Sequence, residues 1–394
     1  MFKKREIENK ILQNIDNNKV ILILWARQVW KTTILKKIKD DIEKQWKETF
    51  YFNLEKYLHK DFFNKDPENI LELVWNNKNI KYVFIDEIQL LDNPSNFLKL
   101  LYDEHKDHIK LIVTWSSAFY IDKKFKDSLA GRNKIFYMYS LNFREFLIFK
   151  KKDKLLNELC KKETWLYYKH DIIKLYKEYI TYWGYPDVVL ANSISEKIEI
   201  LSDIANTYLK KDIFEANIKY EEKYFFILKI LASQIWNLLN VNEISNTVNL
   251  PSTTVEKYIY VMRKSFHIAT IKPFFEKNIR KELTKMTKVY FFDIWLRNYF
   301  INNFEPLDFR IDIWSVLENL VYINLIINTS FDEIKFWRTQ NKNEVDFVIE
   351  REKKAYEVKT NLKKFDEKKY KLFKNTYDNF TLEAIDLEKS LELL

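Results

Sequence analysis

Glycine, cysteine and histidine are scarce in this chain, and no stretch of it is both long and apolar. The 394 residues include two glycines, one cysteine and five histidines. A single thiol, Cys160, cannot form an internal disulfide, which fits a reducing compartment. The few scattered histidines give no zinc-like spacing. No apolar run approaches the roughly 20 residues of a membrane helix, and residues 1–8 show no secretory signal, so we expect a cytoplasmic protein without membrane contact.

The charges that are present weakly favour anionic partners. Lysine and arginine number 66 against 57 acidic residues, which gives a formal net charge of +9. This sign favours contact with nucleic acid or nucleotide. Lysine, asparagine and isoleucine are abundant along the whole chain, as an AT-rich coding bias would produce, so the charge alone does not select a partner.

Tryptophan is in excess where glycine is lacking. The chain holds 11 tryptophans and two glycines, where about 28 glycines are expected at an average usage of about 7%. UGA encodes tryptophan in one variant genetic code and glycine in another, so we interpret most of the tryptophans as glycine positions. The tryptophans that stand where a backbone favours glycine or at element boundaries are Trp25, Trp30, Trp115, Trp183, Trp236, Trp295 and Trp314. We interpret Trp337 as genuine, and the alternative is a tryptophan-rich chain with a degenerate loop.

A phosphate-binding loop is predicted between a strand and a helix near the N-terminus. Residues 20–24 form a continuous apolar run, which is typical of a buried parallel strand. With glycine at positions 25 and 30, residues 25–32 read G-x-x-x-x-G-K-T, a loop whose main-chain N–H groups surround phosphates. We expect Lys31 to contact the β- and γ-phosphates of ATP, and Thr32 to hold Mg²⁺. The residues predicted to bind the nucleotide are Trp25, Ala26, Arg27, Gln28, Val29, Trp30, Lys31, Thr32 and Thr33.

A second predicted strand ends in two acidic residues. Residues 81–86 are mostly apolar up to Asp86, and Glu87 follows directly. This is the Walker B pattern, in which Asp86 positions Mg²⁺ and Glu87 orients and deprotonates the attacking water. Solvated acids at a strand end are the alternative, but the pairing with the phosphate-binding loop favours the catalytic interpretation.

Further strands carry candidate sensors of the γ-phosphate. The strand over residues 109–113 is followed by Thr114 and Ser116, either of which is the sensor candidate, with a helix N-cap as the alternative. Arg132 precedes a strand over residues 135–139 and is either an arginine finger or sensor, or part of a surface salt bridge. Together with a strand over residues 49–54, this alternation of strands and helices predicts a doubly wound α/β domain of the P-loop type over residues 1–147.

Helices predominate in the middle of the chain. Residues 148–222 have a helical pattern without visible chemistry, and we interpret them as a connector or lid. Residues 223–280 predict a winged helix whose third helix spans residues 253–264. The candidate DNA contacts on that helix are Lys257, Tyr260, Arg263 and Lys264. The alternative is that this module packs against the ATPase domain or a protein partner.

Residues 281–394 predict a small α+β domain with acids in a nuclease-like pattern. An amphipathic helix is followed by three short strands with hairpin spacing. Glu357 and Lys359 are two residues apart on the third strand and therefore share a face. With Glu318 and Asp346 they match the PD-(D/E)xK nuclease pattern, in which the acids hold Mg²⁺ and the lysine activates water. A salt-bridged charge cluster without cleavage is the alternative.

The motifs together resemble those of a family of prokaryotic AAA+-like P-loop ATPases with a C-terminal domain of unknown function. The resemblance rests on ARQV-KTT, YVFIDEIQLL, T-SSAF, SLAGR and LNFREFL, and continues through GYPDVV at residues 184–189 to the end of the chain. The tryptophans at positions 25 and 30 depart from the pattern of the family. The resemblance implies a PD-(D/E)xK nuclease-like fold for the C-terminal domain.

These observations predict an ATP- and Mg²⁺-dependent switch or motor. In this interpretation ATP closes the N-terminal domain and reorients the winged-helix and C-terminal domains. Its partners would be DNA through the winged helix, a protein, or a second copy of the chain. Two alternatives stay open, namely a DNA nuclease gated by ATP, and a nucleic-acid or protein binder that does not hydrolyse ATP.

Overall fold

A five-stranded parallel sheet forms the centre of residues 1–141, one of two units into which the chain divides in the computed structural model; residues 142–394 form the other. The predicted end of the ATPase domain at residue 147 lies inside this second unit. The structure describes residues 3–25, 30–74, 79–115, 129–159, 161, 165–235, 237–275, 286–330, 332–341 and 343–394.

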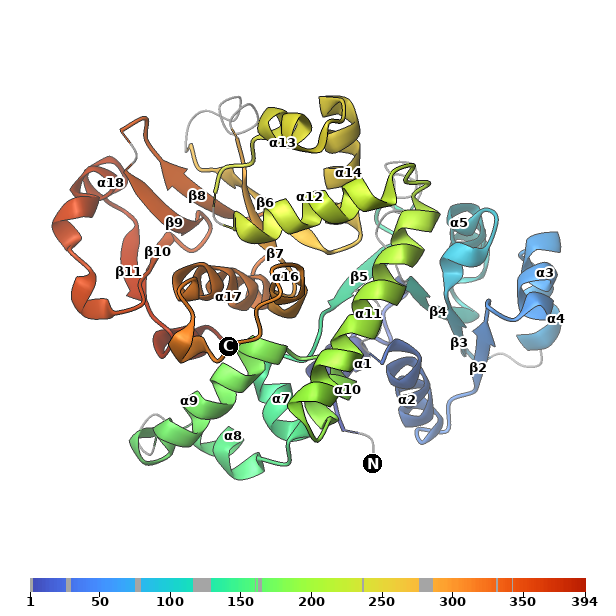
Figure 1. Ribbon diagram of the computed structural model, residues 1–394. Helices are drawn as coiled ribbons and strands as arrows, with labels where there is room; N and C mark the ends of the chain where they lie inside the picture. The colour runs from blue at the N-terminus through green and yellow to red at the C-terminus, as the bar shows by residue number, and fades with distance from the viewer. Residues whose placement is uncertain are drawn as a thin grey trace. The chain divides into compact units, whose positions relative to one another are not determined.

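The strands of the first unit run in the same direction, in the order β2-β3-β4-β1-β5 (Figure 1). They are β1 (Val20–Trp25), β2 (Thr49–Asn53), β3 (Lys81–Asp86), β4 (Ile109–Trp115) and β5 (Asn133–Met138). Each strand predicted in this region is confirmed, with small shifts at its ends. Because the strands are parallel, the carboxyl ends of β1, β3 and β4 lie at one edge of the sheet.

Helices cover both faces of this sheet, which confirms the predicted α/β class. Leu22 and Leu24 of β1 belong to the apolar core that contains residues of α3, α4 and α5. Ile21 and Ile23 alternate with them and are also buried. Burial on both faces explains why β1 is a continuous apolar run. The helices are α1 (Glu6–Leu12), α2 (Lys31–Glu43), α3 (Tyr57–Lys65), α4 (Asn69–Val74) and α5 (Pro94–His105), with the short 3₁₀-helix η1 (Ile88–Leu90).

The second unit begins with helices, as predicted for residues 148–222. Helix α9 ends at Tyr182 and α10 begins at Pro186, a residue that is well accepted in a first helical turn. The helices are α7 (Phe143–Phe149), α8 (Asp153–Leu159), α9 (Trp165–Tyr182), α10 (Pro186–Leu190), α11 (Ile194–Glu215), α12 (Glu221–Ser233), α13 (Val241–Val248), α14 (Ser252–Lys264), α16 (Ile294–Phe300), α17 (Ile313–Asn328) and α18 (Lys371–Thr376). Among the described residues, no helix is both long and apolar enough to cross a membrane.

A six-stranded mixed sheet with the order β11-β10-β9-β8-β6-β7 completes the second unit. Its strands are β6 (Ile268–Pro273), β7 (Lys288–Phe291), β8 (Ile334–Arg338), β9 (Glu344–Ile349), β10 (Lys354–Val358) and β11 (Thr381–Ile385). The short 3₁₀-helices are η3 (Leu307–Phe309), η4 (Leu362–Lys364), η5 (Glu367–Tyr370) and η6 (Lys389–Leu393). The predicted domain boundary at residue 280 falls between β6 and β7, which pair antiparallel, so hydrogen bonds of one sheet cross that boundary.

Three tryptophans occupy backbone positions that favour glycine. Trp30, Trp46 and Trp183 have φ of 60°, 61° and 65°, in the left-handed region where a Cβ atom is strained. Trp183 directly follows α9, the position at which helices commonly end on glycine. These conformations support the interpretation of Trp30 and Trp183 as glycine positions, and they add Trp46, which the sequence patterns did not reveal.

Other tryptophans do not share this backbone conformation. Trp115, Trp295 and Trp314 lie in described segments and do not have positive φ. Trp337 is buried and packs edge-on against Phe373, with ring centroids 5.2 Å apart. The packing of Trp337 fits its interpretation as a genuine tryptophan, whereas backbone conformation gives no support to a glycine at 115, 295 or 314.

Replacing Trp46 by glycine is expected to stabilise the fold. Its side chain is 95% exposed, so little apolar packing is lost with the indole. We expect the free energy of unfolding of Trp46→Gly to exceed that of Trp46→Ala by roughly 1 kcal/mol, because alanine keeps the Cβ atom in the left-handed region. Urea unfolding of the two variants measures the difference. Equal stability of the two variants would contradict the assigned backbone conformation.

Candidate functional site

A threonine and an aspartate meet at the carboxyl edge of the parallel sheet. Thr32 lies in the first turn of α2, which follows β1, and Asp86 is the last residue of β3. Thr32 Oγ1 donates a hydrogen bond to Asp86 Oδ2 at 2.8 Å. The two residues predicted to hold Mg²⁺ are therefore in direct contact, and both supply oxygen atoms, the ligand type that this ion prefers.

The carboxylate of Asp86 is buried and is held by two further hydroxyl groups. Tyr51 of β2 donates to Oδ2 at 3.1 Å, and Thr114 of β4 donates to Oδ1 at 2.5 Å. Asp86 is 1% exposed, and the donors offset the cost of burying its charge. Burial and the neighbouring carboxylate hold the pKa of Tyr51 well above its ordinary value, so this phenol acts as a hydrogen-bond donor.

Thr114 also fixes the backbone at the predicted catalytic acid. Its Oγ1 accepts a hydrogen bond from the main-chain N–H of Glu87 at 2.8 Å. Glu87 has φ of 61° and is nearly buried, and Gln89 donates a side-chain hydrogen bond to its carboxylate. Since β4 lies between β1 and β3, Thr114 occupies the position between the phosphate-binding loop and Glu87. The other sensor candidate, Ser116, lies outside the described residues.

The structure describes the two ends of the predicted phosphate-binding loop. Trp25 ends β1, and Trp30 immediately precedes α2, whose first residue is Lys31. An indole is a donor only, so Trp30 cannot cap the N–H groups of the first turn of α2, and those groups carry the positive end of the helix dipole. Thr33 is exposed on α2. The remaining predicted loop residues, Ala26, Arg27, Gln28 and Val29, lie outside the described part of the chain.

Arg132 forms a salt bridge, the alternative that the sequence left open beside its predicted role as an arginine finger or sensor. Its guanidinium binds both carboxylate oxygens of Asp103, at 2.7 and 3.1 Å. Its carbonyl accepts from the main-chain N–H of Val20, at the first residue of β1. Asp86 ends β3 and Thr32 lies in the first turn of α2, at the carboxyl edge of the sheet, whereas Arg132 precedes the first residue of β5 at the opposite edge. The predicted role of Arg132 at a nucleotide stays a prediction.

The four residues of the nuclease-like pattern lie in and beside the mixed sheet. Glu318 is on α17, Asp346 on β9 and Glu357 on β10, and Lys359 directly follows β10. The carboxylate of Glu357 accepts a hydrogen bond from Lys359, and Asp346 Oδ2 accepts from the N–H of Val358 at 2.9 Å. Burial is the largest of the effects that raise the pKa of Glu357 to about 7. Lys288, which the sequence patterns did not single out, contacts two of these acids.

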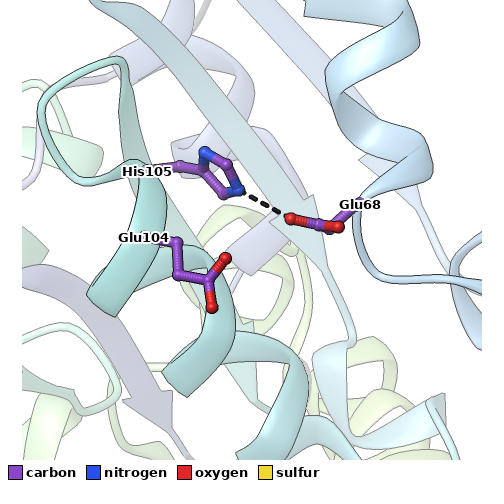
Figure 2. A group of neighbouring side chains, drawn as sticks. All are labelled: Glu68, Glu104 and His105. Atoms are coloured by element: carbon purple, nitrogen blue, oxygen red, sulfur yellow. Dashed lines mark hydrogen bonds and ion pairs between the residues drawn. The ribbon is translucent and has the colours of Figure 1, made fainter.

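A separate group of possible metal ligands lies on the first unit (Figure 2). His105 Nε2 lies 2.9 Å from Glu68 Oε1, and Glu104 precedes the histidine at the end of α5. We call these three residues the Glu68 group. Glu104 is exposed and the other two are half-buried, so the ion pair between Glu68 and His105 accounts for the contact shown.

The predicted third helix of the winged helix has the expected inner and outer faces. Val255 and Met262 of α14 are buried, as expected for its inner face. Lys257, Tyr260 and Arg263 are exposed. Lys264 is half-buried, with its ammonium 5.6 Å from the ring centroid of Tyr260. Strands β6 and β7 follow α14 and pair antiparallel. Leu238 adds an isolated β-bridge to Lys288, the first residue of β7.

Three segments of the chain match protein-family models. Residues 17–147 match the model of a family described as an AAA domain. Residues 173–307 and 315–387 match two families described as domains of unknown function, DUF8612 and DUF4143. The N-terminal part is therefore an α/β domain with a parallel sheet, and its sequence is similar to the AAA family. This domain class is the one that the sequence motifs predicted for the N-terminal part.

Two uncharacterized proteins are similar to nearly the whole chain. An uncharacterized protein of Methanocaldococcus jannaschii is 27% identical over 418 aligned positions, covering 99% of this chain and 88% of the relative. An uncharacterized protein of Haemophilus influenzae is 25% identical, covering 91% and 85%. Among solved structures, Drosophila ORC bound to DNA is 13% identical and aligns over 73% of this chain and 92% of that chain, with a TM-score of 0.33.

Removing the hydroxyl of Thr114 is expected to destabilise the protein. Thr114→Val keeps the shape of this fully buried side chain but leaves an oxygen of Asp86 and the N–H of Glu87 without their partner. Buried polar groups left unpaired cost about 1–3 kcal/mol each. We expect the free energy of unfolding to fall by roughly 2 kcal/mol, measured by urea unfolding. Thr114→Ser retains the hydroxyl and serves as the control, and a valine variant as stable as wild type would contradict the network.

Proposed function

We propose that the chain is an ATP-binding protein that hydrolyses ATP with Mg²⁺ and acts as a nucleotide-driven switch. The observation that carries this proposal is the hydrogen bond between Thr32 and Asp86 at the carboxyl edge of the sheet. It joins the two residues that the Walker A and Walker B patterns assign to one metal ion. The AAA domain match over residues 17–147 supports the same assignment.

Each residue of the site has a role that follows from its position. Thr32 and Asp86 hold the metal ion, which when bound supplies the positive charge that offsets the phosphate oxygens. Glu87 accepts a proton from the attacking water, and Gln89 and Thr114 keep its side chain and backbone in place. Main-chain N–H groups at the start of α2 contact the phosphates, together with Lys31. Thr114 links the backbone of Glu87 to the carboxylate of Asp86 through its hydroxyl.

Glycine at positions 25 and 30 is expected to enable ATP turnover. In the full chain with Trp25→Gly and Trp30→Gly, we expect Mg²⁺-dependent ATP binding by calorimetry and steady phosphate release, because the loop no longer carries two indoles. Adding Glu87→Gln should retain ATP binding and lower turnover by about 10²-fold or more, the usual contribution of a general base.

Three outcomes separate this function from its alternatives. Glu104→Gln removes the same charge from an exposed position on α5 and should leave turnover unchanged. ATP binding without turnover in the glycine variant would favour the non-hydrolysing binder. Absence of Mg²⁺-dependent ATP binding in the folded glycine variant would end the proposal.

We further propose DNA as the partner of the winged helix, through the outer face of α14. Lys257, Tyr260 and Arg263 are exposed and follow one another at steps of three residues, so two cations and an aromatic ring share one side of the helix. Helix α14 ends in two basic residues, whose charge the negative end of the helix dipole favours. Cationic side chains on a third helix are the groups that contact phosphates in this fold.

Removing two cations from α14 is expected to weaken binding to duplex DNA and to reduce its salt dependence. Lys257→Ala with Arg263→Ala should reduce the magnitude of the slope of log K against log salt by about 2, since each lost phosphate contact reduces it by about 1. Lys210→Ala with Lys229→Ala removes the same charge from exposed positions on α11 and α12 and is the control. Equal losses for both pairs, or no DNA affinity in wild type, would favour a protein partner instead.

A further inference from the structure

A lysine ammonium lies among the acids of the mixed sheet. Nζ of Lys288 lies 3.1 Å from Oε1 of Glu318 and 3.4 Å from Oδ1 of Asp346, and it also pairs with Glu344. Glu318 comes from α17, the other two acids from β9, and Lys288 is the first residue of β7. One cation therefore connects a helix with two strands that are not neighbours in the sheet.

Lys288, Glu318 and Asp346 are buried, whereas Glu344 is partly exposed. The side chains of Lys288 and Glu318 are both 0% exposed, and that of Asp346 is 4% exposed. Burial by itself lowers the pKa of Lys288, but the three neighbouring carboxylates outweigh it and hold the pKa above its ordinary value. Because buried charges are costly unless they are paired, the ammonium and the acids stabilise each other.

The other contacts of Glu318 also come from within the protein. Its Oε1 accepts a hydrogen bond from the hydroxyl of Tyr290 at 2.6 Å, in addition to that from Lys288. Tyr290 stacks on Tyr322, with ring centroids 4.9 Å apart, and so fixes β7 against α17. Glu318, the first acid of the nuclease-like pattern, is therefore bound by Lys288 and Tyr290 of β7, neither of which belongs to the pattern.

The predicted Mg²⁺ ligands of this pattern do not converge on one point. Mg²⁺ requires near-octahedral oxygen ligands at about 2.0–2.1 Å, so its carboxylates must lie close together. In the described part of the chain, only the Glu68 group brings three acidic or histidine ligand atoms within 4.8 Å of one another. Glu318, Asp346 and Glu357 do not. Because Lys288 Nζ lies within 3.4 Å of both Glu318 Oε1 and Asp346 Oδ1, a divalent ion bound to these two carboxylates would have to take the place of its ammonium.

We propose that Lys288 is the resident cation of this carboxylate cluster, in the position that a divalent metal ion would need. The cluster then joins β7, β9 and α17 and is closed to metal-dependent cleavage of phosphodiesters. This inference departs from the predicted nuclease-like site of Glu318, Asp346, Glu357 and Lys359. It is independent of ATP chemistry, because all of its residues lie in the second unit.

Binding of Mn²⁺ to the full chain, counted by electron paramagnetic resonance of the free ion, tests this proposal. Wild type is expected to bind no Mn²⁺ at the cluster, whereas Lys288→Ala should gain one ion per chain. Adding Glu318→Gln and Asp346→Asn to Lys288→Ala should remove that ion again. The Glu68 group and the residues of the nucleotide site are the same in all of these variants, so any ion they bind cancels in the comparison.

Lys335→Ala is the matched control. Lys335 is a partly buried lysine of β8, and its ammonium lies 3.5 Å from the carboxylate of Glu350. Removing this lysine should leave the Mn²⁺ count at the wild-type value, because Lys335 does not lie among the acids of the cluster. A gain of Mn²⁺ in both lysine variants would show a general loss of positive charge instead and would overturn the proposal.

Two further results would overturn the proposal. The first is a Lys288→Ala variant that is folded by circular dichroism but gains no Mn²⁺. The second needs no change at Lys288: if wild type binds an Mn²⁺ ion that Glu318→Gln with Asp346→Asn removes, the acids hold a metal despite the lysine. If Lys288→Ala is unfolded, recovery of its thermal transition with Mn²⁺ supports the proposal. If Mn²⁺ does not restore the transition, the proposal is decided by comparing Mn²⁺ binding of wild type with that of Glu318→Gln with Asp346→Asn.

Discussion

The buried carboxylate of Asp86 organises the carboxyl edge of the parallel sheet. Its two oxygens accept hydrogen bonds from Thr32, Tyr51 and Thr114, which belong to α2, β2 and β4. Three elements that are distant in sequence thus depend on a single charge. Because Thr114 also binds the N–H of Glu87, the position of that acid follows from the same charge. Stability and chemistry at this edge therefore cannot be changed independently.

The sequence predicted most of the N-terminal fold because buried parallel strands leave a strong signal. The run at residues 20–24 is apolar throughout and buried, and in residues 109–113 only Lys110 is polar, with its ammonium donating to the carbonyls of Asn17 and Lys19. The contact between Thr32 and Asp86 followed from motifs whose spacing is fixed by the chemistry of phosphate binding. Tyr51 was missed because a tyrosine within a strand is common, and only the pairing of β2 with β3 brings its hydroxyl to Asp86.

Prediction was weaker where distant segments determine a role. The sequence left Arg132 open between a sensor role and a salt bridge, and the strand register places it level with the start of β1, where it pairs with Asp103. Lys288 carries no motif, and only the folding of β7 beside α17 brings its ammonium to Glu318. The positive φ of Trp46 likewise depends on the backbone turn after the end of α2 at Glu43, which the pattern of apolar residues does not reveal. In each case the deciding information is three-dimensional.

The mixed sheet of the second unit has a consequence for motion. Strand β6 follows α14, pairs with β7 on one side and runs parallel to β8 on the other, so this segment and the acidic cluster share one hydrogen-bonded framework. A hinge between them would have to break the ladder between β6 and β8. Any displacement driven by nucleotide would therefore carry α14 and the acidic cluster as one rigid body, with its pivot outside this sheet.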